Sequence, residues 1–110
     1  MEFLIVNDNK NSVKVALSDI FYLTPSGEKP HVLDVVTLQG LYEVHSTLSR
    51  LESELKSGFF RCHRKYLVNL KMVRGINNST KSILFLGDQV GSIPYSRYKK
   101  KELLALWKQI

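Results

Sequence analysis

The residues whose types and spacing could carry chemistry gather around the run Phe-Phe-Arg-Cys-His-Arg-Lys-Tyr-Leu-Val-Asn-Leu at positions 59–70. Its aromatic and apolar members can anchor the segment to a core, while Arg61, Arg64 and Lys65 face outward. An anchored basic loop of this kind suits contacts to phosphates and base edges. Lys and Arg also occur on ordinary solvated edge strands. On composition, we favour nucleic-acid binding over that simpler interpretation.

A second basic cluster comprises Arg97, Lys99, Lys100 and Lys101, just after Ser96. Ser96 is a good N-cap for a last helix running from 97 toward 110. Cations at a helix N-terminus oppose the helix dipole, whereas the free backbone N–H groups there attract phosphate. This cluster therefore indicates an anionic partner.

Other reactive side chains give weaker signals. Cys62 has basic neighbours, which would favour a thiolate, but in an extended segment it points opposite to Arg61 and His63 and toward the interior. We expect a buried structural thiol, and a thiol-based sensor stays an alternative. The histidines, His31, His45 and His63, have no metal-ligand spacing. Because the carboxylates are scattered and the glycines isolated, we expect no enzyme, no metal and no cofactor.

Short strands must position these residues. Apolar runs between turn residues predict strands at 3–6, 13–17, 20–23, 31–38, 41–45, 72–76, 82–86 and 89–93. Leucines at 48, 51 and 55 predict a helix over 47–56, capped by Ser46 or Thr47. We therefore expect a mostly-β, antiparallel fold with one or two short helices.

Composition limits the class of partner. A chain of 110 residues with a net charge of +6 is the size of one domain and is biased toward polyanions. It lacks the ~20-residue apolar run that spans a bilayer. With only one cysteine, no intramolecular disulfide can form, which fits a reducing compartment. We expect a cytoplasmic protein with no membrane partner.

These residues resemble the LytTR family of DNA-binding domains. Positions 59–70 are similar to its F-x-R-x-H-R-S-Y-L-V-N-L signature, with Lys65 in place of serine, and positions 93–97 are similar to its I-P-V-S-R motif. Further matches lie at 40–43, 47–48 and 51–52. They occur in order over nearly the whole chain, so residues 1–110 are expected to form one LytTR-like domain, with no receiver-like sequence before it.

The resemblance implies an elongated stack of small antiparallel β-sheets whose loops enter successive major grooves of double-stranded DNA. It also implies a bacterial transcriptional regulator, the output domain of a response regulator, that binds direct repeats as a homodimer. The family's three base-contacting positions match His31, Arg64 and Arg97. Arginine reads guanine O6 and N7, and histidine can donate or accept at a base edge. Expected phosphate contacts are Lys65, Asn69, Ser96, Lys99, Lys100 and Lys29.

A competing hypothesis is a β-domain that binds RNA, single strands or another protein. Its stacking platform would be Phe60 and Tyr66. It predicts tighter binding to single strands than to duplex, whereas the leading hypothesis predicts the reverse.

Overall fold

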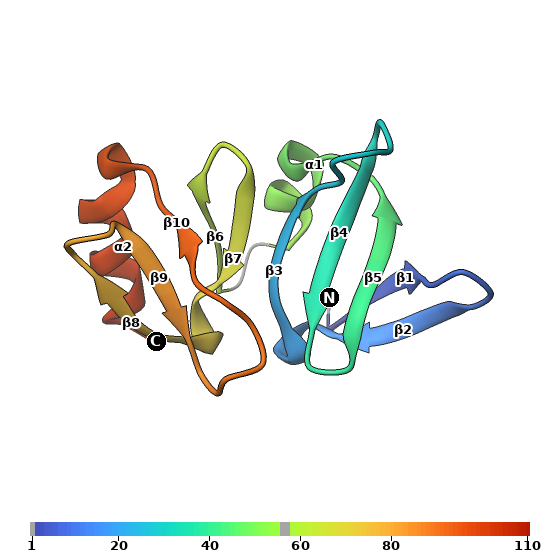
Figure 1. Ribbon diagram of the computed structural model, residues 1–110, viewed down its shortest axis with the longest axis horizontal. Helices are drawn as coiled ribbons and strands as arrows, with labels where there is room; N and C mark the ends of the chain where they lie inside the picture. Colours follow the sequence, from blue (N-terminus) through green and yellow to red (C-terminus); the bar gives the residue numbers. More distant parts are fainter. Residues whose placement is uncertain (1, 56–57) are drawn as a thin grey trace.

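The computed structural model describes residues 2–55 and 58–110, which form two antiparallel sheets (Figure 1). The larger has seven strands in the order β2-β1-β5-β4-β3-β7-β6 within this part of the chain. Their bounds are β1 Phe3–Asn7, β2 Ser12–Ala16, β3 Ile20–Pro25, β4 Val32–Thr37, β5 Gly40–His45, β6 Phe59–His63 and β7 Tyr66–Asn69. Strands β1 and β2 form one antiparallel hairpin of this sheet, and β4 and β5 form another.

The smaller sheet has the order β10-β9-β8 among the described residues. Its strands are β8 Val73–Asn77, β9 Ser82–Phe85 and β10 Ile93–Pro94. The helices are α1 Leu48–Glu54 and α2 Lys100–Trp107, and short 3-10 turns cover Leu17–Asp19, Leu70–Met72 and Arg97–Lys99. The fold is therefore mostly β and antiparallel, as the sequence predicts.

Two hydrophobic cores lie on either side of strands β3 and β7. One core holds Leu23 of β3 and Leu67 of β7 together with the leucines of α1, and the other holds Phe21 and Val68 together with Leu103 of α2. Alternate side chains of a strand point to opposite faces, and a bulge between Ile20 and Tyr22 re-aims Phe21. The two strands thus join the halves of the molecule.

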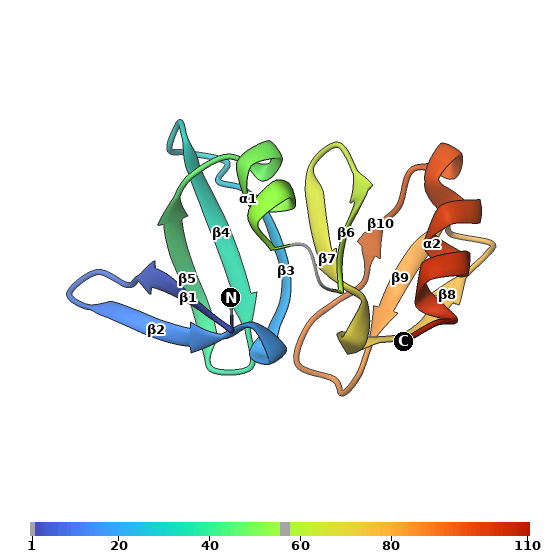
Figure 2. The ribbon, with the colours of Figure 1, turned by 180° about the vertical axis from the view of Figure 1, so that it is seen from behind.

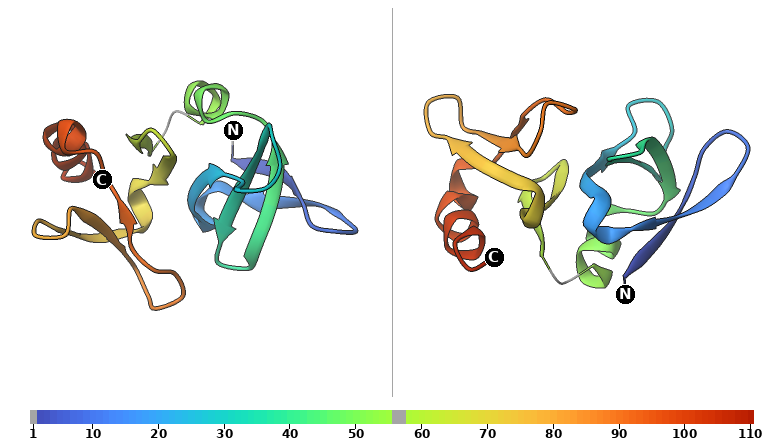
Figure 3. Two further views of the ribbon diagram at one scale, coloured as in Figure 1. Left: turned by 45° about the horizontal axis from the view of Figure 1, so that its top comes forward. Right: turned by 90° about the horizontal axis from the view of Figure 1, so that it is seen from below.

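The molecule is elongated, with extents of 40 × 25 × 25 Å. The two helices lie on one side of the sheets, which is the near side in Figure 2. The β6–β7 hairpin lies between the β1–β5 part and the part that contains β8–β10 and α2, as the view from below in Figure 3 shows. This arrangement places the connections between strands along the two long edges.

Most strand boundaries lie within one or two residues of the sequence-based expectation, but the last strand and the helices need comment. The return strand expected at 89–93 is only Ile93–Pro94, because the polar, glycine-containing segment before Ile93 offers little to bury. The first helix has Thr47 as its cap, accepting from the Arg50 N–H at 3.2 Å, and its expected end at 56 lies outside the described residues. The last helix starts at Lys100, and the Ser96 side chain makes no capping bond.

Candidate nucleic-acid interface

Three connections lie side by side along the upper long edge of the molecule in Figure 1. They are the β3–β4 loop, the β6–β7 turn and the segment from β10 into α2. They carry His31, Arg64 and Arg97 respectively. The fold therefore brings the three expected base-contacting residues to one edge, although they are widely separated in sequence.

The β3–β4 loop is held in shape by Ser26. Its Oγ accepts from the N–H groups of Glu28 at 3.2 Å and Lys29 at 3.1 Å, and its own N–H donates to the Val32 carbonyl at 2.9 Å. His31 is exposed and has a φ of 60°, in the left-handed region that non-glycine residues seldom occupy. Such strain concentrates at functional positions.

Lys29 lies on the same loop and pairs with Glu43 of β5. Its ammonium lies 3.1 Å from both carboxylate oxygens. The pair is exposed, so it is worth little energetically. It nevertheless makes Lys29 a less available phosphate contact than an unpaired lysine.

The β6–β7 turn presents Arg64 and Lys65, both exposed. The turn is stabilised from within, because the Lys65 N–H donates to His63 Nδ1 at 3.1 Å. Burial, together with the positive charges of Arg64, Lys65 and Arg61, lowers the pKa of the His63 imidazole. Among residues 2–55 and 58–110, the ion pairs do not include Arg64 or Lys65, so both side chains are available to a ligand.

The third connection enters α2 through a 3-10 turn. Arg97 is exposed, and its guanidinium carbon lies 5.6 Å from the ring centroid of Tyr98. Ser96 is half-buried, and so are Lys99 and Lys100. The Lys99 ammonium lies 5.7 Å from the ring centroid of Phe60, which anchors it beside the β6–β7 hairpin. Arg97, Lys99 and Lys100 thus lie at the start of α2, which has no side-chain cap.

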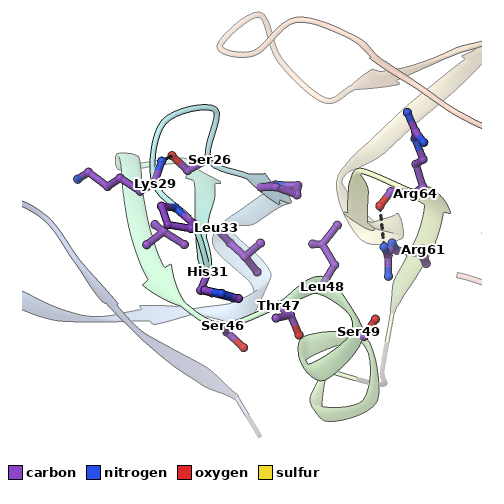
Figure 4. Close-up of a pocket in the computed structure, with 13 residues that line it drawn as sticks. Ser26, Lys29, His31, Leu33, Ser46, Thr47, Leu48, Ser49, Arg61 and Arg64 are labelled. Atoms are coloured by element: carbon purple, nitrogen blue, oxygen red, sulfur yellow. Dashed lines mark hydrogen bonds between the residues drawn. The ribbon is translucent and has the colours of Figure 1, made fainter.

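His31 and Arg64 line a common hollow of about 320 Å³ between the β3–β4 loop, α1 and the β6–β7 turn. Figure 4 shows His31 on the β4 side and Arg64 on the opposite side. Arg97 is not part of this hollow. The edge therefore consists of one concave region, which the two loops line, and a separate basic region at the start of α2.

Asn69 is not a phosphate contact, because its side chain is buried. It is 2% exposed, and its Nδ2 donates to the carbonyls of Ile20 at 2.9 Å and Leu17 at 3.3 Å. Its Oδ1 accepts from the Lys71 N–H at 3.1 Å. The motif position is structural, and it ties β7 to the turn before β3.

The expected stacking platform is not exposed either. Phe60 is 7% exposed and belongs to the core, and the half-buried Tyr66 packs against Tyr22 and His63. Tyr98, at 83% exposed, is the aromatic side chain on this edge that is open to a ligand. In the sequence, the position of Tyr98 between Arg97 and Lys99 in a basic cluster is the feature that indicates its exposure.

Cys62 is fully buried, and burial raises the pKa of its thiol to about 12. This disfavours the thiolate that a redox sensor needs. Within the described ranges, no group of three or more His, Cys, Asp or Glu side chains is placed to hold a metal ion. No helix in that part of the chain is long and apolar enough to cross a membrane.

Known proteins resemble the chain in sequence and in structure. Curated relatives are the transcriptional regulatory protein YpdB of Escherichia coli strain K12 and that of Shigella flexneri, each 36% identical over 91% of the chain. The match spans 43% of each relative's length. A LytTr DNA-binding domain of a methyl-accepting/DNA response regulator from Bacillus cereus superposes with a TM-score of 0.80 at 20% identity, covering 96% of both chains.

The family comparison covers most of the chain. The sequence model described as "LytTr DNA-binding domain" matches residues 10–108, a range that includes all three loops of the upper edge. The solved structure shares the fold, and the curated relatives are similar to the chain in sequence. The chain belongs to the LytTR family of DNA-binding domains.

Proposed function

We propose that the protein binds double-stranded DNA sequence-specifically through the upper edge of Figure 1. The observation that carries the proposal is the position of His31, Arg64 and Arg97 on three adjacent loops of one edge. Arginine is the commonest bidentate reader of guanine in the major groove, and an exposed histidine can donate or accept at a base edge. Rigid loops on a packed scaffold are a common way to present such side chains.

The dimensions of the molecule suit successive major grooves. Its long axis is 40 Å, and the major groove returns to the same face of a duplex about every 34 Å. Loops spaced along that axis can enter neighbouring grooves, and the three proposed base contacts lie outside the two α-helices that the described residues form. In this arrangement Lys65, Ser96, Lys99, Lys100 and Lys29 contact phosphates and set the register.

We further propose that the chain is the output module of a bacterial transcriptional regulator of the response-regulator type, acting in the cytoplasm. The curated relatives are named as transcriptional regulatory proteins, and they are longer than this chain, which leaves room for a regulatory domain. Two copies on direct repeats would form a homodimer on DNA, which doubles the number of bases read.

A selection and a titration test the proposal. An operator is selected from a pool of randomised duplexes, and affinity is then measured for that duplex, for each of its single strands and for the matching RNA. We expect the duplex to bind most tightly, with an affinity that falls steeply with salt. Tighter binding to a single strand or to RNA would contradict it.

A further inference from the structure

Arg61 holds the β6–β7 turn from inside. Its Nη2 donates to the Arg64 carbonyl at 2.6 Å, and its Nε donates to the His63 carbonyl at 3.1 Å. Figure 4 draws the first of these bonds and shows the Arg64 side chain pointing away from Arg61. The backbone of the turn thus faces Arg61, while the side chain of Arg64 faces outward.

Arg61 is in turn fixed by α1. Its Nη1 lies 3.3 Å from Oε1 of Glu52, and its side chain is only 22% exposed. The planar guanidinium can bond in three directions at once, which a lysine ammonium on a flexible stem does not reproduce. The contacts therefore link α1, on one side of the hollow, to the turn that carries Arg64.

We propose that Arg61 is a positioning residue for DNA recognition: together with Glu52 it fixes the turn so that Arg64 meets a base edge. The proposal rests on the proposed function, because it assigns Arg64 to base contact. A direct phosphate contact by Arg61 is the alternative. This alternative fits the structure less well, because the Arg61 guanidinium already donates hydrogen bonds to His63, Arg64 and Glu52.

The sign of a Glu52 substitution separates the two roles. Glu52→Ala removes a negative charge near the DNA, so general electrostatics predicts tighter binding to any duplex. If Glu52 orients Arg61, the same change also removes the acceptor for the Arg61 Nη1–H and weakens binding to the selected operator instead. Glu54→Ala is the matched control, because it removes the same charge from the same helix, whereas Glu54 pairs with Arg50 rather than with Arg61.

A double-mutant cycle completes the test. Operator and scrambled-duplex affinities are measured for Arg61→Ala, Arg64→Ala and the double variant, with Arg50→Ala as the charge-matched control and melting curves for folding. We expect Arg61→Ala to weaken operator binding about 5- to 50-fold, to affect the scrambled duplex no more than Arg50→Ala does, and to add little in the Arg64→Ala background. Arg61→Lys should also lose specificity, although it keeps the charge.

Three results would overturn the proposal while leaving DNA binding intact: equal losses on both duplexes, additive losses in the cycle, or operator binding that Glu52→Ala strengthens as Glu54→Ala does. An Arg64→Ala variant that binds operator like the wild type would instead refute the base contact itself, and the positioning role with it. If Arg61→Ala does not fold, Arg61→Lys and Glu52→Ala decide.

Discussion

The backbone N–H of Ser96 donates a 2.8 Å hydrogen bond to the carbonyl oxygen of Cys62. Cys62 precedes Arg64 by two residues, and Ser96 precedes Arg97 by one. The bond therefore ties the turn that carries Arg64 to the segment that carries Arg97. Cys62 and Tyr95 are also buried in the same hydrophobic core, which strengthens this connection between the two segments. Two proposed base contacts, 33 positions apart in the printed sequence, are thereby held at a fixed separation.

Salt dependence should distinguish His31 from the lysines. Lys65→Ala and Lys99→Ala should weaken binding to all duplexes and reduce the salt slope by about 1 unit each, because each loses a phosphate contact. His31→Ala should weaken operator binding more than scrambled-duplex binding and leave the slope nearly unchanged. Binding isotherms over a salt series measure both quantities. Equal slopes for His31→Ala and Lys99→Ala would refute this division of roles.

Asn69→Ala should destabilise the fold without a specific effect on DNA binding. It removes three internal hydrogen bonds in a buried part of the fold, two to the carbonyls of Leu17 and Ile20 and one from the Lys71 N–H, which should cost about 2–4 kcal/mol of unfolding free energy. Denaturant unfolding measures that loss, and the exposed Asn78→Ala serves as a control. If Asn69→Ala unfolds like the wild type but binds DNA less tightly, the phosphate role would have to be restored.

Cys62 should behave as a structural thiol. Because burial raises its pKa to about 12, almost no thiolate exists at neutral pH, and alkylation of the native protein should be much slower than that of the unfolded chain. Cys62→Ser should cost about 1–3 kcal/mol of stability, because a hydroxyl replaces a buried thiol whose nearest carbonyls are 3.8 and 3.9 Å away. Fast alkylation, with peroxide-sensitive DNA binding that Cys62→Ser abolishes, would support the sensor hypothesis instead.

Acid should weaken the fold through His63. The folded state lowers the pKa of this imidazole, so below about pH 6.5 the unfolded state binds the proton first, and the unfolding free energy decreases as the pH falls. Protonation of Nδ1 would also remove the bond from the Lys65 N–H. His63→Asn keeps an acceptor but does not titrate, so the wild type should lose more stability than this variant between about pH 7 and pH 5. Parallel losses would refute the role of His63.

Much of the fold is predictable because short apolar or alternating runs are separated by turn residues. The alternation in Val13–Leu17 and the leucines of 48–55 predict the observed β2 and α1 well. The end of the chain is harder to predict. Pairing of β10 depends on burial of Ile93 against Ile83, and that partner is not visible in the local sequence.

The candidate site, like the fold, is only partly predictable from the sequence. The family resemblance gives His31, Arg64 and Arg97 as base-contact positions, and these roles stay predictions. Strand parity predicts the burial of Cys62 correctly. Parity could not reveal that Asn69, a polar residue, points into the interior, because its partners are backbone carbonyls around 50 positions earlier in the chain. Nor could the sequence show that Arg61, of the same type as Arg64, faces the backbone of the turn rather than the solvent.

Sequence recognition by the upper edge is tested most directly by comparing two double variants that lose the same charge. Arg64→Ala/Arg97→Ala removes two exposed arginines from the upper edge. Lys10→Ala/Lys108→Ala removes two exposed lysines away from it, in the β1–β2 turn and at the end of α2. Each arginine of the first pair should contribute about 1–3 kcal/mol to operator affinity, and neither pair should change the melting temperature much.

The deciding measurement is the ratio of operator to scrambled-duplex affinity for these two proteins. We expect Arg64→Ala/Arg97→Ala to lower the ratio strongly, because His31 is then the remaining proposed base contact and most of the binding comes from phosphate contacts. Lys10→Ala/Lys108→Ala should keep the wild-type ratio. A ratio that survives in Arg64→Ala/Arg97→Ala, or that falls equally in both variants, would contradict sequence recognition by this edge.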